Sequence, residues 1–378
     1  MKHYKFLDLK DVNAPYMDEL IEAARRVIES GRYIGGEEVE GLEHELAEMV
    51  GTDYAVAVSN GLDALRLSLR ALIELGRLKK GDGVIVPANT YIASVLAICD
   101  AGLRPILVDP DPDTMNLSAE GINSAMSSEV KAVMPVHLYG RVAWNDEMRE
   151  TIERNRLTVV EDCAQSIGAI ATADGLGGKR NAGALGHAGA FSFYPTKNIG
   201  ALGDAGAVTT SDAELAKAVR ALANYGSDHR YHNIYQGFNC RMDPIQAAML
   251  RVKLPHTRSE NADRFALALA YSRTIDNPYV ITPYMSKAVT DCVWHQYVIR
   301  VVDGRRDMFK QQLAEAGVDT DIHYAVAPHM QPCFSTLEHK PLPLTEKLAS
   351  EVLSLPIAHG TSVEDAANIS EIINSIKI

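Results

Sequence analysis

The sequence predicts an α/β fold, with a large three-layer αβα domain around a mostly parallel sheet and a smaller α+β domain after it. Seven short runs between residues 54 and 210 are almost uniformly apolar, which is typical of strands buried on both faces. Helical patterns separate most of these runs, as in a sheet that is covered by helices. With 378 residues, 47% of them hydrophobic, the chain can build a core for each domain.

The chain begins with a predicted extended arm at Phe6–Leu9 and a helix over Met17–Ser30. A glycine-rich bend follows, and a second helix ends near Gly51. Tyr33 in this bend either belongs to an ordinary connector or reaches a ligand at a subunit boundary. The first helix is expected to pack through apolar residues at helical spacing, namely Leu20, Ile21, Ala24 and Val27.

The seven apolar runs define the expected sheet, and its ligands should bind beyond the carboxyl ends of the strands. Helices are expected between the runs, for example at Leu62–Leu75 and Ala93–Ala101. The expected strands are Tyr54–Val58, Gly83–Val86, Pro105–Asp109, Ala132–Val136, Leu157–Glu161, Gly189–Phe193 and Gly206–Thr210.

The pattern changes near Lys253–His256. The remainder mixes helices with amphipathic strands such as Trp294–Val301, and it ends in a helix over Val363–Ile376. We therefore predict a large domain over residues 1–254, which includes the N-terminal arm, and a small domain over residues 255–378.

Composition argues against several classes of partner. A net charge of −12 and a pI near 5.5 make nucleic acid and anionic membranes poor partners. The N-terminus lacks the apolar core of a signal peptide, and no apolar run reaches membrane-spanning length, so we expect a cytoplasmic protein. Five scattered cysteines without a CxxC pair indicate neither disulfides nor zinc, and twelve histidines without ligand spacing imply no metal.

A lysine stands on the turn between the last two predicted strands. Lys197 either points into solvent, as most loop lysines do, or is partly desolvated and forms a Schiff base with a carbonyl cofactor. Ser192 and Asp204 favour the second interpretation, because they offer a hydroxyl and a hydrogen-bonding group for the turn. Three glycines would let the backbone approach a ligand, but their spacing is not a dinucleotide fingerprint: Gly200, Gly203 and Gly206.

Two other strand ends offer groups for a cofactor. In SNGLDAL, Asn60 and Gly61 join a strand to a helix N-terminus, where free amides and the helix dipole attract a phosphate. Such ends are common in α/β proteins, and Asp63 in the first turn should point away from a bound anion. Tyr91 lies at the carboxyl edge of the sheet, where its ring either stacks on a flat cofactor or packs in the core.

The fifth predicted strand ends in two adjacent carboxylates, Glu161 and Asp162. Alternation sends them to opposite faces, so only one can point into a cleft. There it either keeps the ring nitrogen of pyridoxal phosphate protonated, with Gln165 beside the ring, or belongs to a helix cap. The phosphate turn, the aromatic ring, this acid, Ser192 and Lys197 together match what pyridoxal 5'-phosphate requires.

These motifs resemble those of the DegT/DnrJ/EryC1/StrS family of sugar-nucleotide aminotransferases, which are pyridoxal-phosphate enzymes of fold type I. The resemblance extends over essentially the whole chain. Its motifs are YIGGEEVEGLEHELAEMVG, AVAVSNGLDALRLSLRAL, VIVPANTYIAS, VHLYGR, VVEDCAQSIGA, FSFYPTKNIGALGDAGAV, GFNCRMDPIQAAMLRVKL and IHYAVAPHMQP.

The resemblance implies a role for each cofactor residue. Lys197 would bind the cofactor covalently and move a proton between cofactor and substrate carbons. Asp162 would pair with the pyridinium nitrogen, Gln165 would lie close to the ring hydroxyl, and Tyr91 would stack on the ring. The phosphate would be held by Ser192, Asn60, Gly61 and Leu62.

The resemblance also implies a homodimer with shared active sites. Asn239, in GFNCRM, would reach the cofactor phosphate of the neighbouring subunit. His323 and Tyr324 are either part of the small-domain core or contacts to the substrate, and Arg230 is either a solvated charge or such a contact from the partner chain. The positions that resemble those near the diphosphate of a nucleotide sugar are Tyr194, Arg230, His323 and Tyr324.

The version of the lysine motif, FYPTKN followed by GALGD, is similar to that of members acting on 3-keto sugars. It implies amino transfer from L-glutamate to C3 of a dTDP-3-keto-6-deoxyhexose. A 4-keto substrate, a UDP-linked substrate and a non-catalytic regulator that binds the cofactor remain alternatives, whereas Lys197 argues against a dehydratase branch that has histidine there. Three residues depart from the usual family pattern: Leu62, His187 and Ala205.

Overall fold

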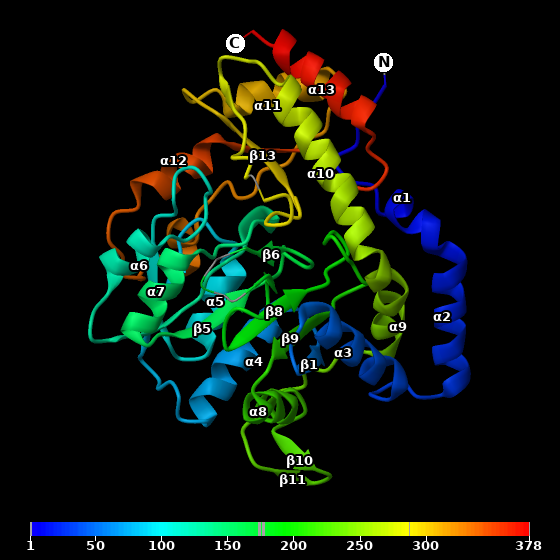
Figure 1. The fold of residues 1–378 in the computed structure, drawn as a ribbon, viewed down its shortest axis with the longest axis vertical. Helices are drawn as coiled ribbons and strands as arrows, with labels where there is room; N and C mark the ends of the chain where they lie inside the picture. The colour runs from blue at the N-terminus through cyan, green and yellow to red at the C-terminus, as the bar shows by residue number, and fades with distance from the viewer. Residues whose placement is uncertain (1, 173–174, 176–177, 287, 378) are drawn as a thin grey trace.

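The computed structural model describes residues 2–172, 175, 178–286 and 288–377. A seven-stranded sheet lies at its centre (Figure 1). The strands of this sheet are β1 (Tyr54–Val58), β2 (Gly83–Pro87), β3 (Arg104–Val108), β4 (Val130–Val133), β5 (Thr158–Asp162), β8 (Ala188–Ser192) and β9 (Gly206–Thr210).

The strand order is β1-β9-β8-β5-β4-β2-β3. Strand β9 is antiparallel to both of its neighbours, and every other neighbouring pair is parallel. The prediction of a mostly parallel sheet is therefore confirmed. Six of the strands lie within one residue of their expected bounds. The exception is β4, which ends at Val133, because the chain up to Val136 makes only an isolated bridge to Asp162.

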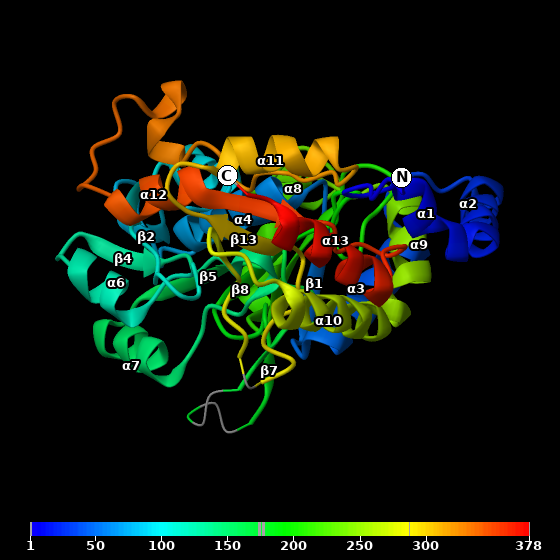
Figure 2. The ribbon, with the colours of Figure 1, turned by 90° about the horizontal axis from the view of Figure 1, so that it is seen from above.

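Helices cover both faces of the sheet, which explains why its strands are apolar throughout (Figure 2). In β1, Val56 and Val58 belong to one core, whereas Ala55 and Ala57 belong to another on the opposite face. The first core contains residues of α4 (Gly61–Glu74), α5 (Ile92–Asp100) and α8 (Ala213–Ala223). On the opposite face lie α3 (Glu37–Val50), α6 (Ala119–Ala125) and α7 (Asp146–Asn155).

The N-terminal helices α1 (Leu9–Asn13) and α2 (Met17–Ser30) lie beside α9 (Pro244–Lys253) (Figure 1). The expected extended arm ends at Asp8, because its side chain accepts a hydrogen bond from the amide of Lys10 and starts α1 at Leu9. The expectation that Ile21 packs is wrong. Helix α2 buries one narrow face, and Ile21 is 52% exposed beside it.

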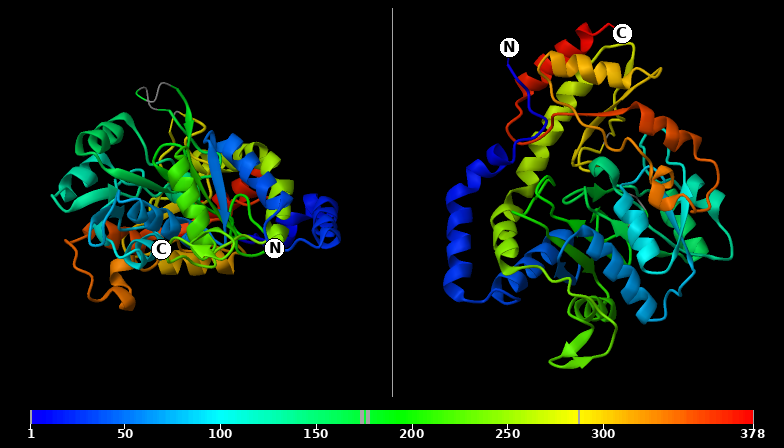
Figure 3. Two further views of the ribbon diagram at one scale, coloured as in Figure 1. Left: turned by 90° about the horizontal axis from the view of Figure 1, so that it is seen from below. Right: turned by 180° about the vertical axis from the view of Figure 1, so that it is seen from behind.

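A second, smaller unit lies above the main sheet and has its own core of Tyr271, Tyr297, Ile299, Phe309 and Leu353, among others. Both chain termini lie at this end of the molecule (Figure 3). Its antiparallel sheet has the order β12 (Val280–Ile281), β13 (Tyr297–Val301) and β14 (Val352–Leu355). Its helices are α10 (Thr257–Thr274), α11 (Arg306–Glu315) and α13 (Val363–Ser375).

Strand β13 begins at Tyr297 rather than at the expected Trp294, because Trp294 has φ 49°, in the left-handed region. Tyr4 of the N-terminal arm donates a hydrogen bond to the carbonyl of Gly317, so the arm lies against the smaller unit. The division of the chain at residue 254 stays a prediction.

The remaining elements are short. β6 (Ile170–Ala171) pairs with β7 (Arg180–Asn181), and α12 (Pro343–Glu351) precedes β14. A hairpin of β10 (Ser227–His229) and β11 (His232–Asn233) projects beyond α8 at the bottom of Figure 1. Within the residues that the structure describes, no helix combines the length and hydropathy needed to cross a bilayer.

Candidate active site

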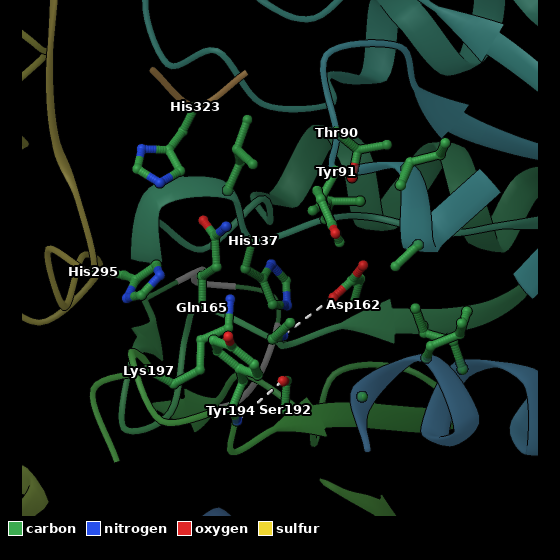
Figure 4. Close-up of a pocket in the computed structure, with 18 of the residues that line it drawn as sticks. Thr90, Tyr91, His137, Asp162, Gln165, Ser192, Tyr194, Lys197, His295 and His323 are labelled. Carbon is green, nitrogen blue, oxygen red and sulfur yellow. Dashed lines mark hydrogen bonds between the residues drawn. The ribbon is translucent and has the colours of Figure 1, made fainter. Parts of the chain in front are cut away.

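A cavity of about 570 Å³ opens at the carboxyl ends of β1, β2, β5 and β8, where ligands of an open α/β sheet bind. The smaller unit closes it from the other side with residues 295–296 and 323–324. Figure 4 shows several of the lining side chains. Those predicted from the sequence are Asn60, Gly61, Leu62, Tyr91, Asp162, Gln165, Ser192, Tyr194, Lys197, His323 and Tyr324.

The two adjacent carboxylates at the end of β5 do point to opposite faces. Asp162 faces the cavity, and its Oδ1 accepts a hydrogen bond of 3.1 Å from the amide of Ala164. Its Oδ2 accepts one of 2.7 Å from the hydroxyl of Ser94 in α5. Ser94 can donate only one proton, so Thr90 must be the donor in the 2.7 Å contact between the two hydroxyls. This chain fixes one orientation of the carboxylate.

Glu161 is fully buried on the other face and is satisfied within the protein. It accepts four hydrogen bonds, from the imidazole of His137 and from the amides of Gly183, Leu185 and Gly186. Because Nδ1 of His137 accepts the amide of Ala143, its Nε2 is the donor to Glu161. Glu161 therefore supports the strand from behind and is not exposed to a ligand.

Lys197 extends from the turn after β8 into the cavity, and it is partly buried there. Desolvation lowers the pKa of its amine to about 8, against the opposing effect of the Asp162 charge. Within the described chain its Nζ has no hydrogen-bond acceptor. A neutral amine is therefore readily available near neutral pH, as attack on a carbonyl requires.

The start of α4 forms the opposite end of the cavity. Asn60 caps the helix by accepting the amide of Asp63, whereas the amides of Gly61 and Leu62 have no partner in the described chain and can face a ligand. A Cβ added at Gly61 would lie 2.6 Å from Cβ of Ser192, so only glycine lets the helix approach that hydroxyl. As expected, Asp63 points away, toward Ser59 and Arg66.

The three glycines after Lys197 serve a different purpose from the one expected. A Cβ at Gly200 would lie 2.3 Å from the carbonyl oxygen of Pro195, and one at Gly206 would lie 2.4 Å from that of Asn60. Gly203 faces the side chain of Gln246 at 2.9 Å. These glycines admit neighbouring parts of the protein, and not a ligand. Asp204 does line the cavity.

Two tyrosine rings and one side-chain amide also line the cavity. Tyr91 and Gln165 belong to the larger unit, and Tyr324 belongs to the smaller one. Tyr91 is 53% exposed, and its ring centroid lies 5.1 Å from that of Tyr324. Gln165 donates a hydrogen bond of 3.0 Å to the Tyr324 hydroxyl and accepts the amide of Tyr139. Burial raises the pKa of the Tyr324 phenol, which therefore stays neutral. The stacking of Tyr91 on a flat ligand stays a prediction, and the exposed ring has surface free for such a contact.

His323 reaches the cavity from the smaller unit. Its Nδ1 lies 2.8 Å from the hydroxyl of Ser354, and its Nε2 lies 3.8 Å from Asp321. Desolvation lowers the pKa of the imidazole, and the charge of Lys197 adds to this effect, whereas Asp321 opposes it. His323 is therefore mainly neutral at physiological pH.

Two predicted residues lie outside the cavity of their own chain. Asn239 is exposed just before Cys240, and Arg230 lies at the tip of the β10–β11 hairpin, where its guanidinium stacks on Tyr231. Neither could contribute to this cavity without a second chain. Tyr33 is also exposed, and its hydroxyl donates to the carbonyl of Ile28.

The departures from the usual family pattern leave the site intact. Leu62 lines the cavity without a hydroxyl. The carbonyl of buried Ala205 accepts the amide of Phe193, a contact that needs no side chain. His187 does not line this cavity, and its Nδ1 accepts a hydrogen bond of 3.0 Å from the amide of Val159.

Several polar residues of the site were not predicted, among them the lining residues Thr90, His295 and Gln296, and Ser94, which bonds to Asp162 from a fully buried position. Ser94 could have been found, because it lies one turn after Tyr91 on the helix that leaves the strand end. His295 and Gln296 could not, because only the packing of the smaller unit places them opposite Lys197.

The cavity fits pyridoxal 5'-phosphate. Free amides and Ser192 suit a phosphate at one end, and Lys197 suits the carbonyl. Asp162, which is held by Ser94 and the amide of Ala164, suits the ring nitrogen. These groups have the chemistry that the cofactor requires at its phosphate, its ring nitrogen and its carbonyl.

Comparison with known proteins agrees with this geometry. Residues 16–374 match the DegT/DnrJ/EryC1/StrS aminotransferase family. The chain is 44% identical, over 98% of both sequences, to dTDP-3-amino-3,6-dideoxy-alpha-D-galactopyranose transaminase from Aneurinibacillus thermoaerophilus.

Solved structures are similar over nearly the whole chain. DesV of S. venezuelae, in complex with a ketimine intermediate, has a TM-score of 0.91 at 41% identity and covers 99% of this chain and 98% of its own. NtdA from Bacillus subtilis, with bound cofactor PMP, has a TM-score of 0.88 at 30% identity and covers 99% of this chain and 85% of its own. The chain therefore belongs to the DegT/DnrJ/EryC1/StrS aminotransferase family, whose members depend on pyridoxal phosphate.

Proposed function

We propose that this enzyme transfers an amino group from L-glutamate to C3 of a dTDP-3-keto-6-deoxyhexose and yields a dTDP-3-amino-3,6-dideoxyhexose. The observation that carries the proposal is the 44% identity, over nearly the full length, to a transaminase named for such a 3-amino sugar. The cavity supports it, because it holds a lysine, an acid and an anion site in one space.

Bound pyridoxal phosphate supplies a carbonyl for the amine and a ring that accepts electrons. Lys197 would bind its carbonyl carbon and, once released, would hold and return a proton at the reacting carbons. Asp162, held by Ser94 and the amide of Ala164, would keep the ring nitrogen protonated. Gln165 would serve the ring hydroxyl, and Tyr91 would stack on the ring. Asn60, Gly61, Leu62 and Ser192 would hold the phosphate.

The sugar nucleotide enters from the open side of the cavity. Tyr194, which is 52% exposed at its rim, and the neutral His323 and Tyr324 contact the sugar or its diphosphate. Glutamate uses the same space first and leaves as 2-oxoglutarate. The two substrates therefore alternate, in a ping-pong sequence.

We propose a homodimer in the cytoplasm. Asn239 and Arg230 are exposed and do not line their own cavity, which suits residues that complete a partner's site. Mixing Lys197→Ala chains with Asn239→Ala chains tests this. After random exchange, about half of the dimers contain one chain of each variant. In such a hybrid, one site combines an intact Lys197 with an intact Asn239, and the other site carries both substitutions. About a quarter of the wild-type activity should therefore return. No recovery after verified exchange would contradict shared sites.

A pair of single-turnover assays tests the substrate. Enzyme first converted to its amine form by glutamate is mixed with a dTDP-3-keto-6-deoxyhexose or with its 4-keto isomer, and the cofactor absorbance is followed. We expect fast recovery of the original absorbance with the 3-keto sugar alone. Recovery with the 4-keto isomer would overturn the position, recovery only with UDP-linked sugars would overturn the nucleotide, and no conversion by glutamate would favour a regulator.

A further inference from the structure

A chain of amide side chains fixes the orientation of His295. Asn261 donates from Nδ2 to the carbonyl of Ile167 at 3.0 Å, which leaves its Oδ1 to accept from Asn198 at 2.9 Å. Asn198 uses the same Nδ2 to donate to the carbonyl of Val293 at 3.1 Å. Two backbone carbonyls thus anchor both amides, and neither amide can be reversed without losing these bonds.

The consequence is a single tautomer of His295. Oδ1 of Asn198 lies 3.0 Å from Nδ1 of His295 and can only accept, so Nδ1 carries the ring proton. The other nitrogen, Nε2, then bears a lone pair. Burial lowers the pKa of this imidazole well below its usual value, and the nearby Lys197 charge lowers it further, so the ring stays neutral.

That lone pair and the Lys197 amine share one cavity. His295 is 5% exposed and lines the wall next to Lys197 (Figure 4). Across the described chain, neither Nε2 of His295 nor Nζ of Lys197 has a hydrogen-bond partner. Asn198, which holds His295, also follows Lys197 directly in the sequence. An oriented acceptor therefore lies beside an unpaired donor.

The other acceptors nearby are less suitable. Both oxygens of Asp162 already accept hydrogen bonds, and its carboxylate is needed for the ring nitrogen. Oε1 of Gln296 is unpaired but sealed from the cavity surface. The titratable and charged groups that line the cavity with Lys197 are Tyr91, His137, Asp162, Tyr194, Asp204, His295, His323 and Tyr324.

We infer that His295 is a positioning residue for Lys197: its unprotonated Nε2 accepts a hydrogen bond from the free Lys197 amine and directs the amine's lone pair toward the reacting carbon. The inference rests on the proposed function, because it gives the freed lysine its orientation between proton transfers. His295 takes no proton in this role. Lys197 alone gains the proton from one carbon and returns it to another.

Two variants separate the acceptor from the packing of the ring. His295→Asn keeps a donor for Asn198 at the Nδ1 position but removes the acceptor at Nε2. His295→Gln keeps a polar atom near the Nε2 position and gives up the contact with Asn198. Thermal melting of both variants checks that they fold, and a purely structural role predicts the larger defect in the glutamine variant.

The first readout uses the apoenzyme and is independent of turnover. Competitive acetylation across a pH series, with mass spectrometry of the Lys197 peptide, gives the pKa of its amine. We expect an inflection near pH 8 in the wild type, at a lower pH in His295→Asn and near the wild-type value in His295→Gln. Equal inflections in the wild type and His295→Asn would overturn the inference.

The second readout needs no active variant. Nitrogen-15 NMR of labelled histidines in the apoenzyme, assigned with whichever variant folds, reports the tautomer of His295. We expect a neutral ring protonated at Nδ1 from pH 6 to 8, and a ring protonated at Nε2 would overturn the inference.

The glutamate half-reaction links these readouts to function. In His295→Asn its rate should fall roughly 5- to 10-fold, the effect of about one lost hydrogen bond, and its acid limb should move to lower pH. An unchanged rate and acid limb would overturn the inference. None of these measurements uses the keto sugar. A different sugar substrate would therefore contradict the proposed function without changing them, and failure of the His295 inference can be told apart from it.

Discussion

The hydroxyl of Ser94 lies 2.7 Å from Oδ2 of Asp162 and donates a hydrogen bond to it. Ser94 belongs to α5, which is far from the Lys197 turn in the sequence. This contact, with the donor Thr90 behind it, orients the only carboxylate of β5 that faces the cavity. Under the proposed function, the cofactor's ring nitrogen would meet an acid that is oriented by the hydroxyl of Ser94 and the amide of Ala164.

Ser94→Ala should weaken binding of pyridoxal phosphate by roughly 5- to 10-fold, because Asp162 loses one hydrogen bond of about 1 kcal/mol that holds it. Fluorescence titration of the apoenzyme measures the affinity. Ser68→Ala is the control, since Ser68 is equally buried but bonds only to the carbonyl of Ala64 in its own helix. Equal affinity in both variants would show that Ser94 does not position the acid.

Glu161→Gln and Asp162→Asn should have opposite effects. In Glu161→Gln, an NH2 group replaces one carboxylate oxygen and faces N–H groups that also donate, so hydrogen bonds are lost in a buried place. We therefore expect the free energy of unfolding to fall by about 2–4 kcal/mol. Asp162→Asn should instead keep its stability and lose most activity, because an amide does not hold a proton on the ring nitrogen. Chemical denaturation and transaminase assays on both variants measure this. A stable Glu161→Gln variant would contradict the assignment of faces.

Gly61→Ala should weaken cofactor binding strongly while the chain still folds. The new Cβ would meet Ser192 at 2.6 Å and push the start of α4 away from the phosphate end of the cavity. Gly121→Ala in α6 is the matched control, because its nearest neighbours lie at 3.5 Å and alanine there should cost nothing. Cofactor content after dialysis is the measurement, and full retention in Gly61→Ala would place the phosphate elsewhere.

Lys197→Met should abolish turnover and stabilise the apoenzyme. The unfolded chain has the ordinary lysine pKa of 10.5, whereas the folded chain has one of about 8. Between these values the unfolded chain binds more protons, so wild-type stability rises with pH in this window, and the burial cost is fully present below pH 8.

The methionine variant should therefore exceed the wild type by about 3 kcal/mol at pH 7 and approach it near pH 10.5. Urea denaturation of both apoenzymes at several pH values tests this. Lys217→Met, at an exposed position of α8, should show no such trend. A pH-independent difference would mean that Lys197 is not desolvated.

Much of this fold could be predicted because burial on both faces leaves a direct trace in the sequence. The run Tyr54–Val58 is apolar since α3 covers one side and α4 and α8 the other. The reversed direction of β9 leaves no such trace, because a buried strand is equally apolar in either orientation. The late start of β13 also depends on a local backbone conformation at Trp294 that composition does not reveal.

The site divides in the same way. Lys197, Asp162 and Gly61 lie in local motifs whose chemistry can be inferred from neighbouring residues. His295 and the lysine turn meet only through long-range packing, and the tautomer of His295 depends on Asn261, which is distant from both in the sequence. The wrong expectation for Gly200 and Gly206 has a similar cause, since the backbone that approaches them belongs to Pro195 and Asn60.

The cavity is lined both by strand ends of the main sheet and by residues 295–296 and 323–324 of the smaller unit. Pyridoxal phosphate bound there would stabilise only those chains in which both units are folded. Bound cofactor should therefore couple the unfolding of the two units. We expect a single thermal transition in the holoenzyme and a broader or split transition in the apoenzyme. When pyridoxal phosphate is scarce, partial unfolding of the smaller unit would then expose the enzyme to proteolysis. The amount of enzyme in the cell would therefore follow the supply of its cofactor.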